Sequence, residues 1–288
     1  MSALPNDRSG QALGDILSKQ NDLAVLPQVV FKIMEMTGAE SSSVTDLERA
    51  IAIDPGFSAR ILSQANSAHF ALPKKVTSIH EAIMFVGFKS IRQLAATIGV
   101  FDMFLGKNDA ESIRRRAWWR QSIDTGVAAQ AIAKRINGMD SDTVYTAGLL
   151  HLIGKTVLDR YSPGDYLKVE KLLEAGAGDI QAEQAVFWLD HVMVGFAVAQ
   201  RWGFPKELIL SLDYCNAPQE TEPCRQNRAL LAVGHAIALV VRDGIHVDDA
   251  PNALPQWAMD ILGFSEEQYL PIINEGRGAI MEAARLHI

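Results

Sequence analysis

The sequence predicts an all-α fold, and three observations indicate it. Apolar residues recur at helical spacing through most of the 288 residues, and helix-capping patterns precede several of these stripes. No stretch alternates polar and apolar residues for long enough to demand a sheet. Because 48% of the residues are hydrophobic, the chain can bury a substantial core, as one large or two modest domains.

The first predicted helices are marked by proline and capping residues. Pro27 suits the first turn of a helix that ends at Gly38, since proline is favoured at a helix start and glycine just after its end. The capping box Thr45–Glu48 predicts the start of a short second helix. Asp54 is placed to cap a third helix, whose first residue is Pro55.

The third helix is expected to end at Asn66-Ser67, where local hydrogen bonds from side chain to backbone adequately explain both residues. A second capping box, Ser78–Glu81, predicts a fourth helix, and Gly87 is its expected left-handed end. A fifth helix starts near Lys89. The polar segment 106–109 is the best internal boundary.

Beyond this boundary the pattern stays helical. A long helix is predicted from about Glu111 to Asn137, and the next from about 142 to 161, closed by Pro163-Gly164. Further helices are expected over residues 165–175, 179–187, 191–202, 205–213 and 226–243, with one or two more beyond residue 254.

Charge and composition narrow the class of partner. The net charge is −7 and the pI is near 5.5, which argues against a nucleic-acid or anionic-membrane surface. We interpret the basic cluster of Arg114, Arg115, Arg116 and Arg120 as a solvated helix face. The sequence shows no signal segment or membrane span, so we expect a cytoplasmic protein, and its two cysteines are expected to be reduced thiols.

The segment Gly148-Leu149-Leu150-His151-Leu152-Ile153-Gly154-Lys155 holds a histidine without a neighbouring carboxylate. It is similar to the central helix of the HD phosphohydrolases, where a His-Asp doublet in this context holds divalent metal ions that activate water. Leu152 stands where that aspartate would be and offers no lone pair. Metal-assisted hydrolysis is therefore not expected.

Several motifs of the N-terminal half stand in the order and spacing of one family. They are Leu26-Pro27, Asp54-Pro55, Ala65-Asn66-Ser67-Ala68-His69-Phe70, Ser78-Ile79, Ala82-Ile83 and Gly87. With the altered HD segment they resemble the HDOD family, the HD-related output domains of bacterial signal transduction, over about residues 23–240. The resemblance implies a regulatory protein with an N-terminal helical layer packed on an HD-related bundle.

This resemblance implies three parts of the chain and a set of site positions. The parts are an N-terminal extension (1–22), the helical layer (23–108), and a degenerate HD-like bundle with C-terminal helices (109–288). The remnant of the HD site is expected to hold Gln121 in place of the first histidine, His151, Leu152 in place of the aspartate, His191, Tyr214 beside Cys215 in place of a His-His pair, and His235 near the position of the terminal aspartate.

We expect no metal ion or cofactor at this remnant, because isolated histidines on apolar helices are usually hydrogen-bonded core residues, and no carboxylate is seen that would orient them. One alternative stays open: a single divalent metal ion on His151, His191 and His235 would give a metal-dependent phosphohydrolase with a rearranged site.

A second alternative is a module that binds a nucleotide second messenger, with Trp119, Arg120 and Tyr214 as the available cavity walls. The favoured interpretation is a non-catalytic regulatory protein. We expect it to bind other signalling proteins in trans, or a small ligand, since the chain has no room for a signalling partner domain in cis.

Overall fold

The computed structural model describes residues 8–19, 32–33, 36, 43–67, 70, 72, 74–106, 108–246 and 248–285. The predicted all-α fold is confirmed, since this described part of the chain is built of helices and contains no strand. One helix, α1 (Arg8–Lys19), lies within the expected N-terminal extension. None of the described helices is both long and apolar enough to cross a membrane.

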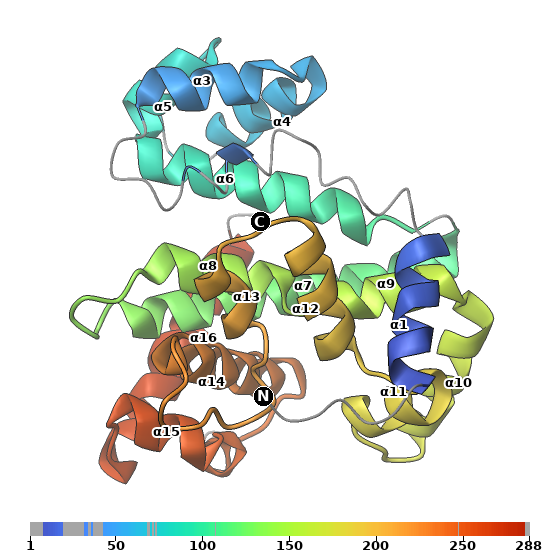
Figure 1. Cartoon of the computed structure of the whole chain (residues 1–288). Coiled ribbons are helices and arrows are strands. Elements are labelled where there is room, and N and C mark those ends of the chain that lie inside the picture. The colour runs from blue at the N-terminus through green and yellow to red at the C-terminus, as the bar shows by residue number, and fades with distance from the viewer. Residues whose placement is uncertain are drawn as a thin grey trace.

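The helices fall into an upper layer and a larger bundle (Figure 1). The upper layer consists of α3 (Val44–Ala52), α4 (Pro55–Ala65), α5 (Ile79–Val86) and α6 (Phe88–Phe101), followed by the 3-10 helix η4 (Asp102–Phe104). The bundle begins with α7 (Asp109–Ala133), α8 (Ser141–Leu150), α9 (Ile153–Tyr161), α10 (Pro163–Glu174), α11 (Asp179–Phe187) and α12 (His191–Arg201). It continues with α13 (Lys206–Ser211), α14 (Arg225–Arg242), η5 (Ala250–Ala253), α15 (Gln256–Leu262) and α16 (Glu266–Arg285).

Two of the predicted caps in the upper layer are confirmed. Asp54 Oδ1 accepts hydrogen bonds from the backbone N–H groups of Gly56 (2.8 Å) and Phe57 (3.1 Å), and α4 begins at Pro55. The Ser78 side chain caps α5. Gly87 has φ +94°, as its role predicts, and joins α5 to α6 without a linker.

The predicted start of α3 was wrong by two residues. Ser43 caps this helix and forms the capping box with Asp46. Glu48 is not available for a cap because its carboxylate reaches α5, where it lies 3.2 Å from His80 Nδ1. The predicted helix from Pro27 to Gly38 lies largely outside the described residues, as do Leu26-Pro27 and Ala68-His69.

Asn66 forms long-range hydrogen bonds instead of the expected local ones. Its Nδ2 donates to the Val76 carbonyl (2.9 Å), and its Oδ1 accepts from the Val76 backbone N–H (2.8 Å). The amide thus pairs with a backbone ten residues ahead, which fixes the start of α5 against the end of α4. Ser67 follows directly, outside the helix.

The predicted single helix over residues 142–161 is two helices, with a break at His151-Leu152. Nδ1 of His151 lies 2.6 Å from the Gly148 carbonyl, the acceptor that a continuous helix would offer to the backbone N–H of residue 152. At the start of α9 the chain also passes very close to α12, since a side chain at Gly154 would collide with the His191 carbonyl. The break therefore brings the two segments together.

The interpretation of the arginine cluster as a solvated face was wrong for two of its members. Nε of Arg115, which is 1% exposed, lies 2.6 Å from an oxygen of Asp159, which is fully buried. Arg114 binds the other oxygen of Asp159, at 2.5 Å. The cluster therefore joins α7 to α9. Arg116 is exposed, and the Arg120 side chain is 41% exposed although it pairs with Asp124 at 2.8 Å.

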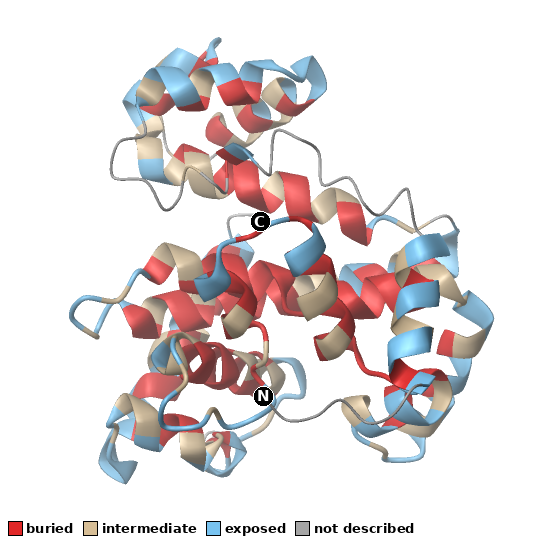
Figure 2. Cartoon of the chain, viewed as in Figure 1, coloured by how far each residue is buried: buried red, intermediate tan, exposed pale blue. Residues whose placement is uncertain are grey.

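The core of the bundle lies where α7, α8 and α14 meet, and buried residues dominate these helices (Figure 2). Small residues permit the close packing: a side chain at Gly148 would collide with Gly126, and one at Gly234 would collide with Ala129. These contacts place the C-terminal end of α8 beside α14. That junction holds the site residues.

Candidate functional site

Two histidines that lie 84 positions apart in sequence form a hydrogen-bonded pair inside the bundle. His151 follows α8 and is 1% exposed, whereas His235 lies within α14 and is partly buried. Nε2 of His151 lies 3.0 Å from Nδ1 of His235. Because the Gly148 carbonyl can only accept, the proton of His151 is on Nδ1, so its Nε2 accepts the hydrogen bond from His235.

A third histidine is held by a buried carboxylate. His191, the first residue of α12, is fully buried, and its Nδ1 lies 2.6 Å from Oε2 of Glu183, which is also fully buried. The same oxygen accepts from the His191 backbone N–H at 2.8 Å. Glu183 thus fixes the orientation of the imidazole. The expectation that no carboxylate orients these histidines was wrong.

Tyr214 lies among the three imidazoles. Its hydroxyl is 2.9 Å from His191 Nε2. Its ring centroid lies 4.6 Å from that of His235, 5.0 Å from that of His151 and 6.1 Å from that of His191. The phenol therefore bridges the three histidines and takes up the space between them.

The nitrogen atoms of this cluster do not fit a metal ion. A ligand must offer an unused lone pair toward a shared point. His151 Nε2 is hydrogen-bonded to His235, and His191 Nε2 to Tyr214. Within the described part of the chain, no group of three or more His, Cys, Asp or Glu side chains is arranged to hold a metal ion. Metal binding by His151, His191 and His235 would require both hydrogen bonds to break.

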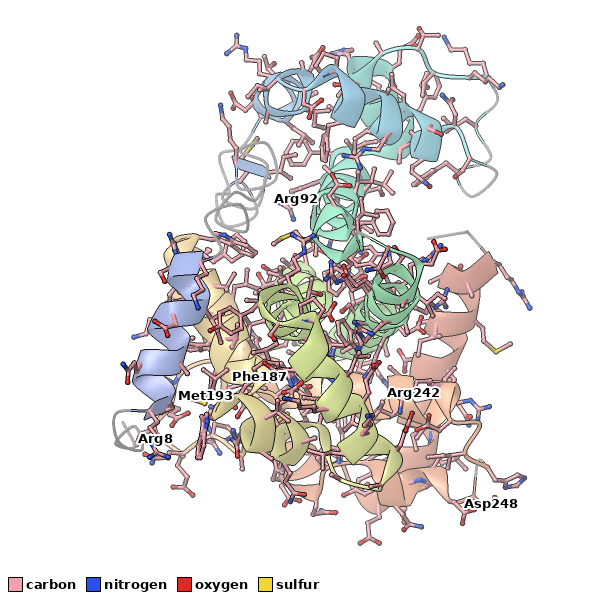
Figure 3. All side chains as sticks on the ribbon, turned by 90° about the vertical axis from the view of Figure 1, so that its right-hand side faces the viewer. Arg8, Arg92, Phe187, Met193, Arg242 and Asp248 are labelled. Atoms are coloured by element: carbon pink, nitrogen blue, oxygen red, sulfur yellow. The ribbon has the colours of Figure 1, made fainter. Side chains whose placement is uncertain are left out.

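The two remaining site positions also lack metal-binding geometry. Leu152 is fully buried in the turn between α8 and α9. Gln121 of α7 is 7% exposed, and its Oε1 accepts a 3.3 Å hydrogen bond from Arg242. Figure 3 shows Arg242, labelled, on α14. The side chain at the position of the first HD histidine is thus tied to the rim of the bundle.

Burial sets the ionisation of the histidine pair. Burial lowers the pKa of His151 to about 3, although the hydrogen bond to the Gly148 carbonyl acts to raise it, and the nearby Lys155 ammonium adds to the lowering. Burial, with the nearby His151, also holds the pKa of His235 well below its ordinary value. Both rings are therefore neutral at pH 7, as the hydrogen bond between them requires.

These lowered pKa values predict a loss of stability in mild acid. The unfolded chain takes up protons on these histidines below about pH 6.5 while the folded chain does not, so stability is full above that pH and falls toward pH 3. For His151 alone the free energy of unfolding should drop by about 2 kcal/mol between pH 7 and pH 5. Urea denaturation at both pH values measures this.

The matched variants for this measurement are His151→Gln and His246→Gln. The first should reduce the change between pH 7 and pH 5. The second should leave it as in the parent, because the His246 side chain is 72% exposed. A parent protein equally stable at both pH values would contradict the assignment of a buried neutral pair.

Beside the histidines lies a pair that the sequence analysis missed. Lys155 is 4% exposed, and its ammonium lies 2.6 Å from Oδ1 of Asp179, the first residue of α11. The sequence could have indicated Lys155 as a site residue, because it belongs to the Gly148–Lys155 segment. It could also have indicated that Glu183 is buried, because Glu183 lies four residues before the buried Phe187 on one face of α11. No such pattern marks Asp179.

The three wall residues proposed for a nucleotide site have separate surroundings. The Trp119 ring is tilted against those of Phe101 and Phe104, with centroids 5.4 Å apart in both pairs. Trp119 also lines a groove between the upper layer and the bundle. Arg120 pairs with Asp124, and Tyr214 lies among the histidines. Their described contacts do not join them into one cavity.

Comparison with known proteins finds a matching family and solved structures of similar fold. The family model of the HDOD domain matches residues 23–218, so it ends before α14 and His235. A crystal structure of an HDOD domain protein of unknown function from Geobacter sulfurreducens has a TM-score of 0.78 at 22% identity, covering 96% of each chain. A protein provisionally named a phosphohydrolase, from Shewanella amazonensis SB2B, has a TM-score of 0.72 at 24% identity, covering 94% of this chain and 97% of that one.

Two further relatives are longer than this chain. A protein provisionally named for signal transduction, from Marinobacter aquaeolei VT8, has a TM-score of 0.75 at 21% identity, and the match covers 99% of this chain and 67% of that one. An uncharacterized protein of Treponema pallidum (strain Nichols) is 25% identical over 215 residues, which are 72% of this chain and 41% of that protein. The chain thus spans less than half of that curated relative.

Proposed function

The chain belongs to the HDOD domain family, and from this premise we propose that it is a non-catalytic regulatory protein that acts by binding other signalling proteins in trans. Its fold is related to that of the HD phosphohydrolases.

One observation carries the proposal: the aromatic ring of Tyr214 lies among the histidines where a metal centre would need open space and free lone pairs. Leu152 and Gln121 add no metal ligands suited to a dinuclear centre. A hydrolase needs a metal-bound water with an open coordination position. Packing of this kind supports a structural role for the cluster.

The test is metal content together with turnover. We expect purified protein, incubated with manganese, iron or zinc and then desalted, to retain no stoichiometric metal and to hydrolyse neither phosphodiesters nor phosphomonoesters. The measurements are elemental analysis and a substrate screen. Two ions bound near His151, or one ion with turnover, would overturn the proposal in favour of a metal-dependent phosphohydrolase with a rearranged site.

A small ligand is a second candidate, favoured by the groove that Trp119 lines. This cavity of about 370 Å³ lies between α4, α6 and α7 and also contains Phe101 and Arg60. Arg60 is already held by Asp102 through two hydrogen bonds of 2.5 and 2.8 Å, so its charge is largely neutralised. The groove therefore suits a flat, uncharged aromatic compound better than a nucleotide phosphate.

Tryptophan fluorescence tests this candidate. Titration with adenosine, guanosine and their phosphates should show saturable quenching by the nucleosides only, and Trp119→Leu should abolish it. Equal response of the parent and the Trp119→Leu protein would reject the groove as a ligand site.

A further inference from the structure

Helix α1 lies outside the matched family domain, packs on α9, and is tied by its two ends to the neighbourhood of α12. At its start, the Arg8 guanidinium sits 5.2 Å from the ring centroid of Trp188, shortly before α12 begins. Toward its end, the Leu17 carbonyl accepts a 2.7 Å hydrogen bond from Arg201, the last residue of α12. The two helices are therefore parallel. In Figure 3, Arg8 and Met193 of α12 are labelled at the same side of the molecule.

The attachment of α1 depends on a narrow apolar stripe. Ile16 is 1% exposed, and Ala12, Leu13 and Leu17 pack partly buried against the core. Its polar anchors lie at the surface, where such contacts contribute little; the Trp188 ring is 59% exposed. A helix of 12 residues is marginal without packing, so Ile16 and its neighbours decide whether α1 stays in place.

Between α1 and α12 part of the apolar surface of α12 is left open. A cavity of about 450 Å³ is lined by Leu13 of α1 and by Val192, Met193 and Phe196 of α12. The carboxylates of Asp190 and Asp213 lie at its polar edge. Met193 and Phe196 are only partly buried. Apolar grooves of this kind commonly bind the apolar face of an amphipathic helix, and α1, which is weakly attached, already lies beside this one.

We propose that this groove on α12 is a docking surface for an amphipathic helix of a partner protein, and that α1 is an intramolecular cover which competes with that helix. The partner is expected to resemble α1, with apolar residues at i, i+4 and i+5 and a basic residue near its N-terminal end to meet Trp188. This inference rests on the proposed function, since it names the surface through which binding in trans would occur.

The probe is a fluorescent peptide of residues 8–19 carrying Gly10→Ala and Gly14→Ala. These changes raise helix propensity, and a methyl group at either position meets no atom within 4 Å in the folded chain. The peptide is titrated with full-length protein and followed by anisotropy. In the parent, the attached α1 holds its place beside the groove at high effective concentration and so competes with the peptide. In the Ile16→Asp protein, a buried carboxylate should release α1 and open the groove.

We expect the Ile16→Asp protein to bind the peptide at least about tenfold more tightly than the parent, because the cover no longer competes. Gln11→Asp places the same charge on the exposed face of α1 and should behave as the parent. Adding Met193→Asp to Ile16→Asp should abolish binding. Circular dichroism must show unchanged helix content in the body of each variant.

Folded Ile16→Asp protein that binds the peptide no better than the parent, or no peptide at all, would overturn the proposal. Binding that survives Met193→Asp would move the interface away from α12 and overturn it as well. Neither result bears on the metal and turnover measurements, which test the proposed function separately.

Discussion

Replacing Leu152 by aspartate is expected to destabilise the protein without producing hydrolase activity. Leu152 is fully buried, and the nearby nitrogen atoms of His151 already hold other partners. A buried carboxylate without a partner costs about 3–5 kcal/mol, or it takes up a proton. Equilibrium denaturation at pH 7 measures the loss directly.

The effect should depend on pH in a defined direction. Burial raises the pKa of a carboxyl group above its unfolded value, so the variant is least destabilised in acid, where the group is neutral in both states. Relative to the parent at the same pH, the loss should grow from pH 5 to pH 7. Leu152→Asn has a similar shape and no charge, and its loss relative to the parent should not grow in this way.

Activity should stay absent in the Leu152→Asp protein because a single carboxylate does not complete the metal site. Gln121 remains bonded to Arg242, and Tyr214 still lies among the histidines. Full stability of the variant at neutral pH would show that position 152 is open to solvent or to metal. Turnover on adding manganese would contradict the expectation outright.

Local patterns predicted the helices well, because their causes lie within a few residues. The cap at Asp54 and the positive φ at Gly87 follow from the preferences of single residues. The break between α8 and α9 could not be predicted from local patterns, because it depends on the contact of Gly154 with His191, which is distant in sequence. Periodicity also missed α1, whose glycines at 10 and 14 weaken the helical signal and whose apolar stripe is narrow.

The sequence analysis named several residues that the structure brings together, but it did not predict how they are connected. The resemblance predicted that His151, His191 and His235 lie near one another, and in the structure the Tyr214 ring contacts all three. It did not reveal that Glu183 orients His191, because the pairing spans two helices and the left-handed turn at Trp188. Likewise, Arg115 meets Asp159 only through the packing of α7 on α9.

Removing residues 1–108 is expected to leave a fragment that aggregates, because the upper layer and the bundle share an interface. Helix α6 buries Leu94, Ala95 and Val100. Its Thr97 hydroxyl lies 2.8 Å from the hydroxyl of Tyr145 in α8, and Arg92 binds Asp142 at 2.9 Å. Figure 3 shows Arg92 where α6 faces the bundle. Without α6 this surface of the bundle would be open to solvent.

Removing residues 1–108 would also remove the residues that contact the buried Arg115 side chain and the Trp119 ring. The Leu105 carbonyl accepts a 3.0 Å hydrogen bond from Arg115, and Phe101 and Phe104 cover Trp119. An unpaired buried donor and an exposed apolar patch both favour aggregation. For the intact chain we accordingly expect one cooperative unfolding transition that includes the upper layer.

Comparing urea denaturation of the intact chain with that of residues 109–288 decides between one unit and two domains on a linker. A matched control is the chain lacking only residues 1–19, which keeps α6 and its contacts and should stay soluble with a single transition. The two truncated proteins differ in whether they keep the upper layer. If the fragment 109–288 aggregates and the chain lacking residues 1–19 does not, the upper layer is what stabilises the bundle. A soluble fragment 109–288 that unfolds cooperatively with unchanged stability would instead establish two independent domains.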